Sequence, residues 1–333
     1  MIGTVRVSAR YFSVLIVGIL FPIATPAQMP PSSADQSVLK GRPHLFGPGI
    51  ISTPDAEANA SFTPDGATFY FAKHTPGWSR DTIVLSHRRG QNWGEPEVAP
   101  FSGLWTDTDP SVSPDGRKLL FASNRPIEGR QLPRKDLDLW YVERTASGGW
   151  GEPQHIRSAV NSDSMESSPS VTRDGTLYFE SSRPTDHPGP HIYRSHLAND
   201  EYSPPEILPF SKETNDMNPV IAPDESFIIF FSLERGGIGG GDLFVSFHRG
   251  DRSWSSPKNL GAPINSISFE SAPGLSPDGR TLYFASDRID RPTTRTRRVN
   301  YRELENELHA IQNGLSNIYE VDISDLQVLN DSG

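Results

Sequence analysis

Short apolar runs recur along the chain and are separated by turns that contain proline, aspartate and glycine. Five of these turns have nearly the same sequence, and each is followed by an apolar run that ends in phenylalanine. Proline fixes φ at the second turn position and Asp-Gly tolerates positive φ, so each turn predicts a β-hairpin. The turn aspartates are Asp65, Asp115, Asp174, Asp224 and Asp278, at spacings of 50, 59, 50 and 54 residues.

Each repeat continues with two further predicted strands. A third apolar run begins at residues 81, 138, 191, 242 and 317, and a fourth strand is expected after an aromatic residue and a proline. Four strands in 50 to 59 residues is the size of a propeller blade. The chain is therefore predicted to be all-β, a five-bladed β-propeller of four-stranded antiparallel blades. The prolines before the fourth strands are Pro96, Pro153, Pro205 and Pro257.

The two ends of the repeat array complement each other. The fifth repeat has no clear fourth strand, whereas Gly47-Pro-Gly-Ile-Ile51 stands before the first repeat, where such a strand would lie. We expect this N-terminal strand to complete the last blade. A closed ring leaves few open sheet edges, so a monomer is expected.

The N-terminus predicts a targeting segment. Arg6 and Arg10 precede an apolar run over residues 11–25, and small residues precede Gln28. The run is shorter than the ~20 residues of a membrane-spanning helix, so residues 1–27 are interpreted as a secretory signal peptide. The predicted domains are this peptide, a flexible leader at 28–44, the propeller at 45–328 and a tail at 329–333. The mature chain is then periplasmic or secreted, with no membrane span.

The composition of the chain excludes several classes of functional site. The chain has no cysteine, which excludes disulfides, thiolate zinc sites and cysteine nucleophiles. Its net charge is -10, or -12 without the two arginines of residues 1–27. An acidic chain argues against nucleic-acid binding. Neither a His-Glu-x-x-His motif nor a Gly-x-Ser-x-Gly motif is present, so the interpretation leans away from an enzyme.

Particular motifs resemble a known family. Ser113-Pro-Asp-Gly-Arg-Lys-Leu-Leu-Phe-Ala-Ser-Asn-Arg125, followed by Asp138-Leu-Trp-Tyr141, is similar to the WD-repeat-like propeller repeats of TolB-type periplasmic proteins. The Gly-rich run at 237–244 also resembles these repeats. The stretch from Asn259 to Glu270 is similar to the same repeats where they are fused to peptidoglycan-binding outer-membrane domains. The resemblance covers about residues 45–325 and implies a periplasmic partner of peptidoglycan-associated proteins. Propellers of that family commonly have six blades, so six is the alternative to five.

An acidic residue lies three positions before the first-strand proline, or its equivalent, in every repeat. Such carboxylates at the start of the innermost strands would repel one another and need partners. One possibility is structural pairing with the arginines that end the second strands, Arg125, Arg183, Arg288 and, one residue later, Arg235. The alternative is a Ca²⁺ ion in the central channel; no other cofactor is expected. The five acids are Glu57, Asp107, Glu166, Asp216 and Glu270.

Departures from the repeat supply further candidates. Blade one has Lys73 and His74 in place of the arginine, and its loops add Trp78 and Trp105, which could grip a glycan or peptide or simply be buried. The repeated Trp93, Trp150 and Trp254 are expected to pack between blades. These candidates lie toward the long loops opposite the Pro-Asp-Gly turns, so binding is expected on that face.

Blade five carries an insertion at residues 289–316. Asn300 is predicted to be the N-cap of a short helix that ends at Gly314. The insertion is interpreted either as a lid or docking element or as a solvated arginine run beside a packed helix. Arg288 directly precedes the insertion, which itself contains Arg291, Arg295, Arg297, Arg298 and Arg302.

Two functions follow from these patterns. The first is a non-enzymatic binding or scaffold protein for envelope proteins or glycans. The second is a carbohydrate-active hydrolase or lyase that uses the ring carboxylates. Two ring carboxylates ~5 to 10 Å apart across a pocket, without arginine partners, would favour the enzyme, whereas arginine-paired carboxylates would favour the scaffold.

Overall fold

The structure, a computed structural model, describes residues 39, 41–75, 79–127, 132–157, 159–250, 253–289 and 294–331. Every element below belongs to the unit Ser37–Gly333. The predicted signal peptide and most of the predicted leader lie outside the described residues. Within the described ranges, no helix has the length and apolar character needed to cross a membrane.

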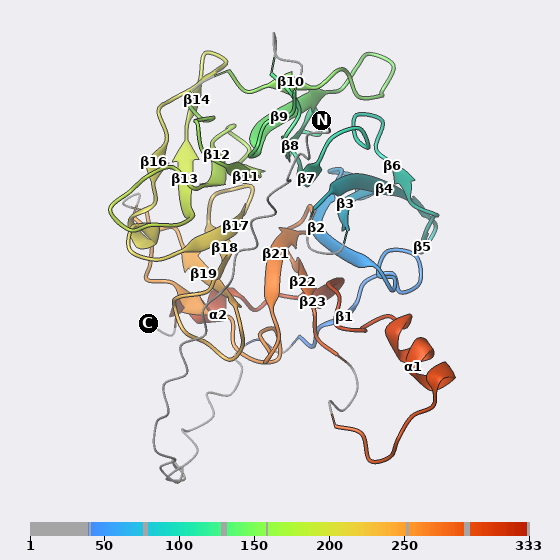
Figure 1. The fold of residues 1–333 in the computed structure, drawn as a ribbon. Helices are drawn as coiled ribbons and strands as arrows, with labels where there is room; N and C mark the ends of the chain where they lie inside the picture. The colour runs from blue at the N-terminus through green and yellow to red at the C-terminus, as the bar shows by residue number, and fades with distance from the viewer. Residues whose placement is uncertain are drawn as a thin grey trace, which may run out of the picture. The chain divides into compact units, whose positions relative to one another are not determined.

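Five antiparallel four-stranded blades form a propeller (Figure 1). The innermost strands contact one another in a closed ring, with β2 next to β7 and β21. Blade one contains β2 (Ala56–Phe62), β3 (Thr68–His74), β4 (Asp81–Arg89) and, as its fourth strand, β6 (Glu97–Val98). The short β5 (Asn92–Trp93) forms a hairpin with the end of β4. Blade two contains β7 (Asp107–Val112), β8 (Lys118–Ser123), β9 (Asp138–Glu143) and β10 (Gln154–His155).

The remaining blades repeat this order, which confirms five blades instead of six. Blade three contains β11 (Glu166–Val171), β12 (Leu177–Ser181), β13 (His191–Ser195) and β16 (Glu206–Ile207), with a hairpin of β14 (Leu197–Ala198) and β15 (Glu201–Tyr202). Blade four contains β17 (Asp216–Ile221), β18 (Phe227–Ser232), β19 (Asp242–Phe247) and β20 (Lys258–Asn259), after the 3-10 turn η2 (Pro209–Ser211). Blade five contains β21 (Glu270–Leu275), β22 (Thr281–Ser286), β23 (Asn317–Asp322) and β1 (His44–Leu45).

The N-terminal strand closes blade five, as predicted, but it lies earlier in the chain. β1 pairs with β23, and His44 is opposite Glu320. Residues 47–51 form a turn in which the Ile51 N–H donates to the Gly47 carbonyl at 2.8 Å. Gly47 has φ 53°, a conformation that bends the chain and does not extend it.

The Pro-Asp-Gly turns are held by their own side chains. In blade one, Asp65 accepts hydrogen bonds from the Thr63 hydroxyl at 2.6 Å and the Ala67 N–H at 3.0 Å. The Thr63 hydrogen bond lowers the pKa of Asp65, so this carboxylate is charged at neutral pH. Each turn therefore fixes the register of the two strands that it joins.

Aromatic side chains fill the spaces between blades. Trp150 donates from Nε1 to the Tyr70 hydroxyl of the preceding blade at 2.8 Å. Trp254 meets the ring of Tyr178 edge-on, at 6.1 Å between ring centroids. The predicted packing role of the repeated tryptophans is confirmed in these contacts.

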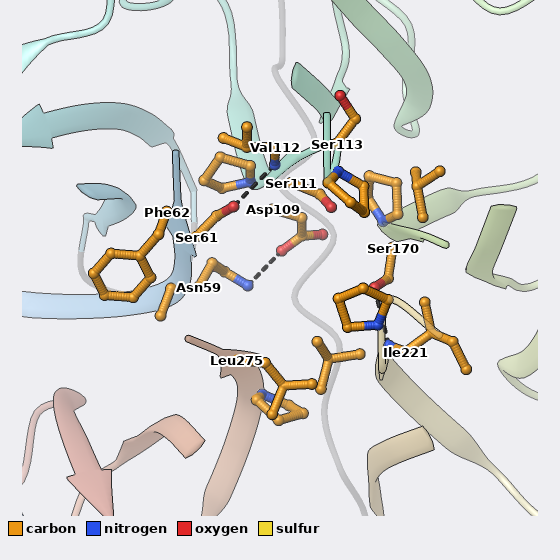
Figure 2. Close-up of a pocket in the computed structure, with 18 of the residues that line it drawn as sticks. Asn59, Ser61, Phe62, Asp109, Ser111, Val112, Ser113, Ser170, Ile221 and Leu275 are labelled. Carbon is orange, nitrogen blue, oxygen red and sulfur yellow. Dashed lines mark hydrogen bonds between the residues drawn. The ribbon is translucent and has the colours of Figure 1, made fainter. Parts of the chain in front are cut away.

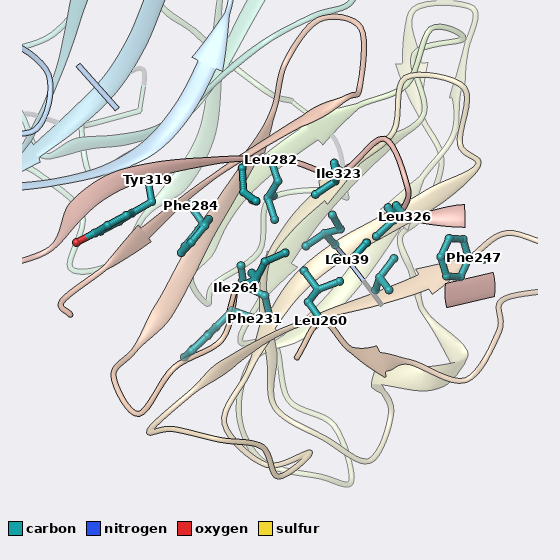
Figure 3. Close-up of a cluster of buried hydrophobic side chains, with 14 residues drawn as sticks. Leu39, Phe231, Phe247, Leu260, Ile264, Leu282, Phe284, Tyr319, Ile323 and Leu326 are labelled. Atoms are coloured by element: carbon teal, nitrogen blue, oxygen red, sulfur yellow. The ribbon is translucent and has the colours of Figure 1, made fainter. Parts of the chain in front are cut away.

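Among the described residues of blade five there is no tryptophan in the equivalent position, and apolar residues from both ends of the described chain help to fill its interface with blade four. Leu39, Ile323 and Leu326 are buried in one cluster with the strands of both blades (Figure 3). Leu39 lies within the segment predicted to be a flexible leader, so that segment packs at this point. The chain ends its described part in α2 (Gln327–Asp331).

The predicted helix of the insertion is present as α1 (Tyr301–Leu308). Asn300 caps it, and Glu303 completes a capping box. The helix ends at Leu308 and not at Gly314, since the Asn313 side chain donates to the Leu308 carbonyl at 2.8 Å and ends the helix there. No residue of α1 is buried.

Candidate functional site

The five predicted ring carboxylates are completely buried, and each binds a cation that lies at the end of the next strand of its own blade or two to three residues beyond it. Asp107, for example, accepts hydrogen bonds from Arg125 and Ser123, both at 2.6 Å. The corresponding N–O distances are 3.2 Å for Glu166 and Arg183, 2.7 Å for Asp216 and Arg235, 3.0 Å for Glu270 and Arg288, and 3.3 Å for Glu57 and Lys73.

The arginines also reach the crossovers between blades. Arg183 donates to the Val160 carbonyl at 2.6 Å, and Arg288 donates to the Ile264 carbonyl at 2.6 Å. Each acid-arginine pair therefore ties a crossover to the second strand of the blade. The sequence left open whether the ring acids pair with arginines or bind a Ca²⁺ ion. The observed contacts are those of structural pairing.

In blade one, a lysine takes the place of the arginine as the partner of the ring carboxylate. Lys73 contacts Glu57 at 3.3 Å and Asp55 at 2.8 Å. Burial raises the pKa of Glu57 against the opposing hydrogen bonds from Thr53 and Asn317. Lysine is a compact point charge without the forked donors of arginine, so it engages this carboxylate less completely.

Among the described side chains, no group of three or more His, Asp or Glu has the arrangement of a metal site. The calcium ion in the channel stays a prediction.

A cavity of about 180 Å³ lies in the central channel, on the face of the Pro-Asp-Gly turns. All five innermost strands line it (Figure 2). Its mouth is formed by Pro64, Pro114, Pro223 and Pro277, with Arg173 at the equivalent position of blade three. The lining residues farthest from the turns are Asn59, Asp109, Ser168, Asn218 and Ala272.

Those five deepest residues all have positive φ, between 46° and 63°. A register shift accompanies each of them in the pairing of the first two strands, as in β2 between Ala58 and Ser61. Such bulges redirect a side chain out of the regular alternation. The left-handed conformation is unfavourable for an alanine or a serine, so the closely packed ring must hold it.

Hydrogen bonds join these residues across the blades. The Asn59 amide donates to Asp109 at 2.7 Å, and the other oxygen of Asp109 accepts from the N–H and hydroxyl of Ser168 at 2.9 and 3.1 Å. The Asn218 amide donates to the Ser168 hydroxyl at 2.9 Å. The deep end of the cavity is therefore a polar network whose only carboxylate among the lining residues is Asp109.

A second carboxylate, Glu180 of β12, lies behind this network. It is 4% exposed and accepts from the Asn218 N–H at 3.1 Å. Burial, with a smaller contribution from the negative charge of Asp109, raises the pKa of Glu180 to about 7. Burial also raises the pKa of Asp109. In the part of the chain that the structure describes, neither carboxylate has an ion pair with lysine or arginine.

None of the residues predicted from the sequence to bind a ligand lines this cavity. The five acids are buried within the blades with their lysine or arginine partners, and the cavity opens on the turn face and not on the long-loop face. His74 lines a different groove, of about 260 Å³, between blades one and five on the long-loop face, and pairs with Asp81 at 2.8 Å. Trp105 is half-buried, and Trp78 lies outside the described residues.

The sequence analysis missed the residues at the deep end of the cavity. The available signal was a polar residue two positions after the acid in four of the five repeats, Asn59, Asp109, Ser168 and Asn218. Regular strand alternation would give these residues and the acids the same face, and only the bulges separate them.

The arginines of the insertion are partly neutralised by the helix that follows them. Arg297 binds Glu303 through both guanidinium nitrogens at 2.9 Å, and Arg295 binds Glu307. Arg291 lies outside the described residues. A role of the insertion as a lid or docking element stays a prediction.

Comparisons with known proteins identify the fold and no family. No family model matches the chain, and no curated protein matches it. A solved structure of BT0996, in an RGII complex, is 10% identical, with a TM-score of 0.52, covering 85% of this chain and 92% of the other protein. An α-L-arabinofuranosidase from Lactobacillus brevis is 12% identical, with a TM-score of 0.50, over 82% and 92% of the two proteins.

TolB from Acinetobacter baumannii is also similar, at 14% identity and a TM-score of 0.44 over 81% of this chain. The chain spans 55% of the length of that protein. At these identities the likenesses show the propeller fold alone. Membership of the TolB-type family stays a prediction.

Proposed function

We propose that this chain is a non-enzymatic binding protein of the bacterial envelope, periplasmic or secreted, whose central cavity receives a narrow polar segment of a partner protein. The location rests on the signal-peptide pattern around Arg6 and Arg10. The observation that carries the binding role is the shape and chemistry of the cavity, which every blade lines.

The size of the cavity favours a single side chain or a chain end. Its volume of about 180 Å³ is below the ~300 to 1,000 Å³ of typical small-molecule pockets. The prolines at the mouth have no N–H groups, and Arg173 places one cation at the rim. A polar segment could exchange hydrogen bonds with the asparagines and serines at the deep end.

The ring carboxylates support binding over catalysis. A glycosidase needs two carboxyl groups that face the substrate. All five ring carboxylates are instead fully buried and engaged by arginine or lysine. Both oxygens of Asp109 are already hydrogen-bonded within the network.

The test is to fill the cavity. Ser111 lines it, and a Ser111→Phe variant should lose the partners that the wild-type protein retains from a detergent-solubilised envelope fraction. Ala146→Phe, in an exposed turn of blade two, is the matched control and should retain them. Retention of every partner by Ser111→Phe, with an unchanged melting temperature, would contradict the proposal.

A hydrolase or lyase is the second candidate, and one observation favours it. Asp109 and Glu180 are neighbouring carboxylates with raised pKa values and no arginine partner among the described residues. Such groups are candidates for general acid catalysis. Turnover of a polysaccharide by the wild-type protein that Glu180→Gln abolishes would favour this candidate over the binding protein.

A further inference from the structure

A large groove lies at the outer edge of blade two, beside the β14–β15 hairpin of blade three. Its volume is about 910 Å³, within the range of ligand-binding pockets and well above that of the central cavity. Residues of β8, β9 and β10 form one side, and residues of the hairpin form the other.

The groove lies where the side chains between two blades differ from those of the other repeats. At the neighbouring interfaces a hairpin tryptophan packs on a tyrosine of the preceding blade, as in Trp150 with Tyr70 and Trp254 with Tyr178. Between blades two and three, the smaller Tyr202 replaces the tryptophan, and Leu120 replaces the tyrosine. The side chains that would fill the interface are thus both smaller here.

Two tyrosines give the groove an aromatic surface. Tyr141 and Tyr202 are half-buried, and both pack on the same apolar cluster with Leu120 and Ile156. The Tyr141 hydroxyl donates to Gln154 at 2.9 Å, and Lys118 lies 4.9 Å from the centre of the Tyr141 ring. Burial raises the pKa of Tyr202 to about 12, so its hydroxyl remains a hydrogen-bond donor at neutral pH.

The groove is lined by equal numbers of acidic residues and of lysine or arginine residues. Its lining contains Lys118 and Arg157 on one side and Asp200 and Glu201 on the other. Lys118 is already paired with Glu143 at 3.4 Å. A ligand with a large net charge would therefore gain little, whereas a neutral ligand with many hydroxyl groups could use both donors and acceptors.

A groove of similar volume lies between blades five and one, but its chemistry differs. It keeps its tryptophan, Trp93, whose ring is packed among Phe46 and Phe62, and it lacks a pair of tyrosines. The groove beside blade two is therefore the better candidate for ring stacking.

We propose that the groove formed by Tyr141, Gln154 and Tyr202 binds a neutral glycan. The apolar face of a sugar ring would stack on the tyrosines, and its hydroxyls would exchange hydrogen bonds with Gln154 and Lys118. This is a second site, with a different ligand from the central cavity, and it goes beyond the protein-binding role proposed above.

The test is calorimetric titration of the full chain with three neutral hexasaccharides: α-1,4-linked glucose, β-1,4-linked glucose and β-1,4-linked N-acetylglucosamine. At least one should bind. Gln154→Ala and Tyr141→Ala should each weaken its affinity by about tenfold or more, a change of about 1.4 kcal/mol. Tyr301→Ala, an exposed tyrosine of the insertion, is the matched control and should bind as the wild type does.

Two outcomes would overturn the glycan site. One is the absence of binding by all three sugars at about 10 mM, far above the range of specific recognition. The other is unchanged affinity in Gln154→Ala, which decides the question even if Tyr141→Ala fails to fold, because Gln154 is exposed. Ser111→Phe should bind the sugar normally, so failure of the central-cavity proposal and failure of this one are distinguishable.

Discussion

A buried carboxylate is tolerated in each blade because a cation and a hydroxyl are supplied within the same blade. Glu166 accepts hydrogen bonds from Ser162 at 2.6 Å and Ser181 at 2.7 Å, in addition to its contact with Arg183. An unpaired charge at such a position would carry a desolvation penalty of several kcal/mol. These pairs therefore matter most when one partner is removed.

Arg183→Ala should lower the free energy of unfolding by about 3 to 5 kcal/mol, because it leaves Glu166 buried without a cation. Urea denaturation measures this change. Adding Glu166→Gln to the same chain should recover part of the loss, since the remaining side chain is neutral. A double variant as unstable as the sum of the two single variants would show that the pair is not coupled.

The raised pKa of Glu180 predicts that the stability of the protein depends on pH in an unusual way. Its pKa in the folded protein is about 7, against an ordinary value of 4.5. Between these two pH values the folded chain holds a proton that the unfolded chain releases. The free energy of unfolding should therefore fall as pH rises from about 4.5 to 7, by a few kcal/mol at most.

Glu180→Gln should make this fall smaller and stabilise the protein at pH 7, as measured by urea denaturation across the pH range, while the raised pKa of Asp109 leaves part of the fall in place. Glu234→Gln is the control. Hydrogen bonds, chiefly from the Asn215 N–H, lower the pKa of Glu234, so its contribution is present at neutral pH and lost in acid. Identical pH profiles for wild type and Glu180→Gln would contradict the raised pKa.

At the scale of elements, strand positions follow from local turn chemistry. The fourth strands begin directly after their prolines, as in β10 after Pro153, because proline ends the preceding hairpin and starts an extended segment. The register of each hairpin follows in the same way from its Pro-Asp-Gly turn. These features lie within a few residues of one another and can be predicted from the sequence.

Two element ends differ from the positions that the apolar pattern predicts, because a side chain or a turn next to the element sets the boundary. α1 ends at Leu308 because Asn313 caps it from outside the helical pattern. β1 lies at His44–Leu45 because the glycines that follow it form a turn. In both cases the apolar pattern continues past the true boundary.

The insertion should be dispensable for folding. Replacing residues 295–310 with a short Gly-Ser linker removes α1, which buries none of its residues, and keeps the Gln312 hydrogen bond to the Tyr319 hydroxyl. The free energy of unfolding should change by less than about 1 kcal/mol, as thermal and urea denaturation would measure. A larger loss would mean that the helix supports blade five. With stability unchanged, loss of a binding partner would favour a docking role.

At the scale of the molecule, the face that holds the cavity could not be predicted. The long loops suggested one face, whereas the cavity opens on the other, between short turns of similar sequence. Its depth and polarity depend on five bulges, one in the first strand of each blade, which regular strand alternation does not predict. Glu180 contributes from a second strand, and nothing in its local sequence indicates that Asp109 lies nearby.

Closure of the ring should make the propeller sensitive to loss of its first strand. A chain beginning at Thr53 would lack β1, Leu39 and the Ser52 hydroxyl that donates to the Ile318 carbonyl at 2.9 Å. It would expose the edge of β23, so we expect aggregation or a large fall in melting temperature. A chain beginning at Ser37 is the control. Equal melting temperatures would contradict a role for β1 in stability.

The pairing of His44 with Glu320 also has a kinetic consequence. β1 leaves the ribosome long before β23 and must wait, without its partner, until almost the whole propeller has been synthesised. Contacts between such distant positions form slowly, and open sheet edges in the meantime invite association with other chains. A chaperone that shields the apolar residues of β22 and β23 during this delay would raise the yield of folded protein without altering its final stability.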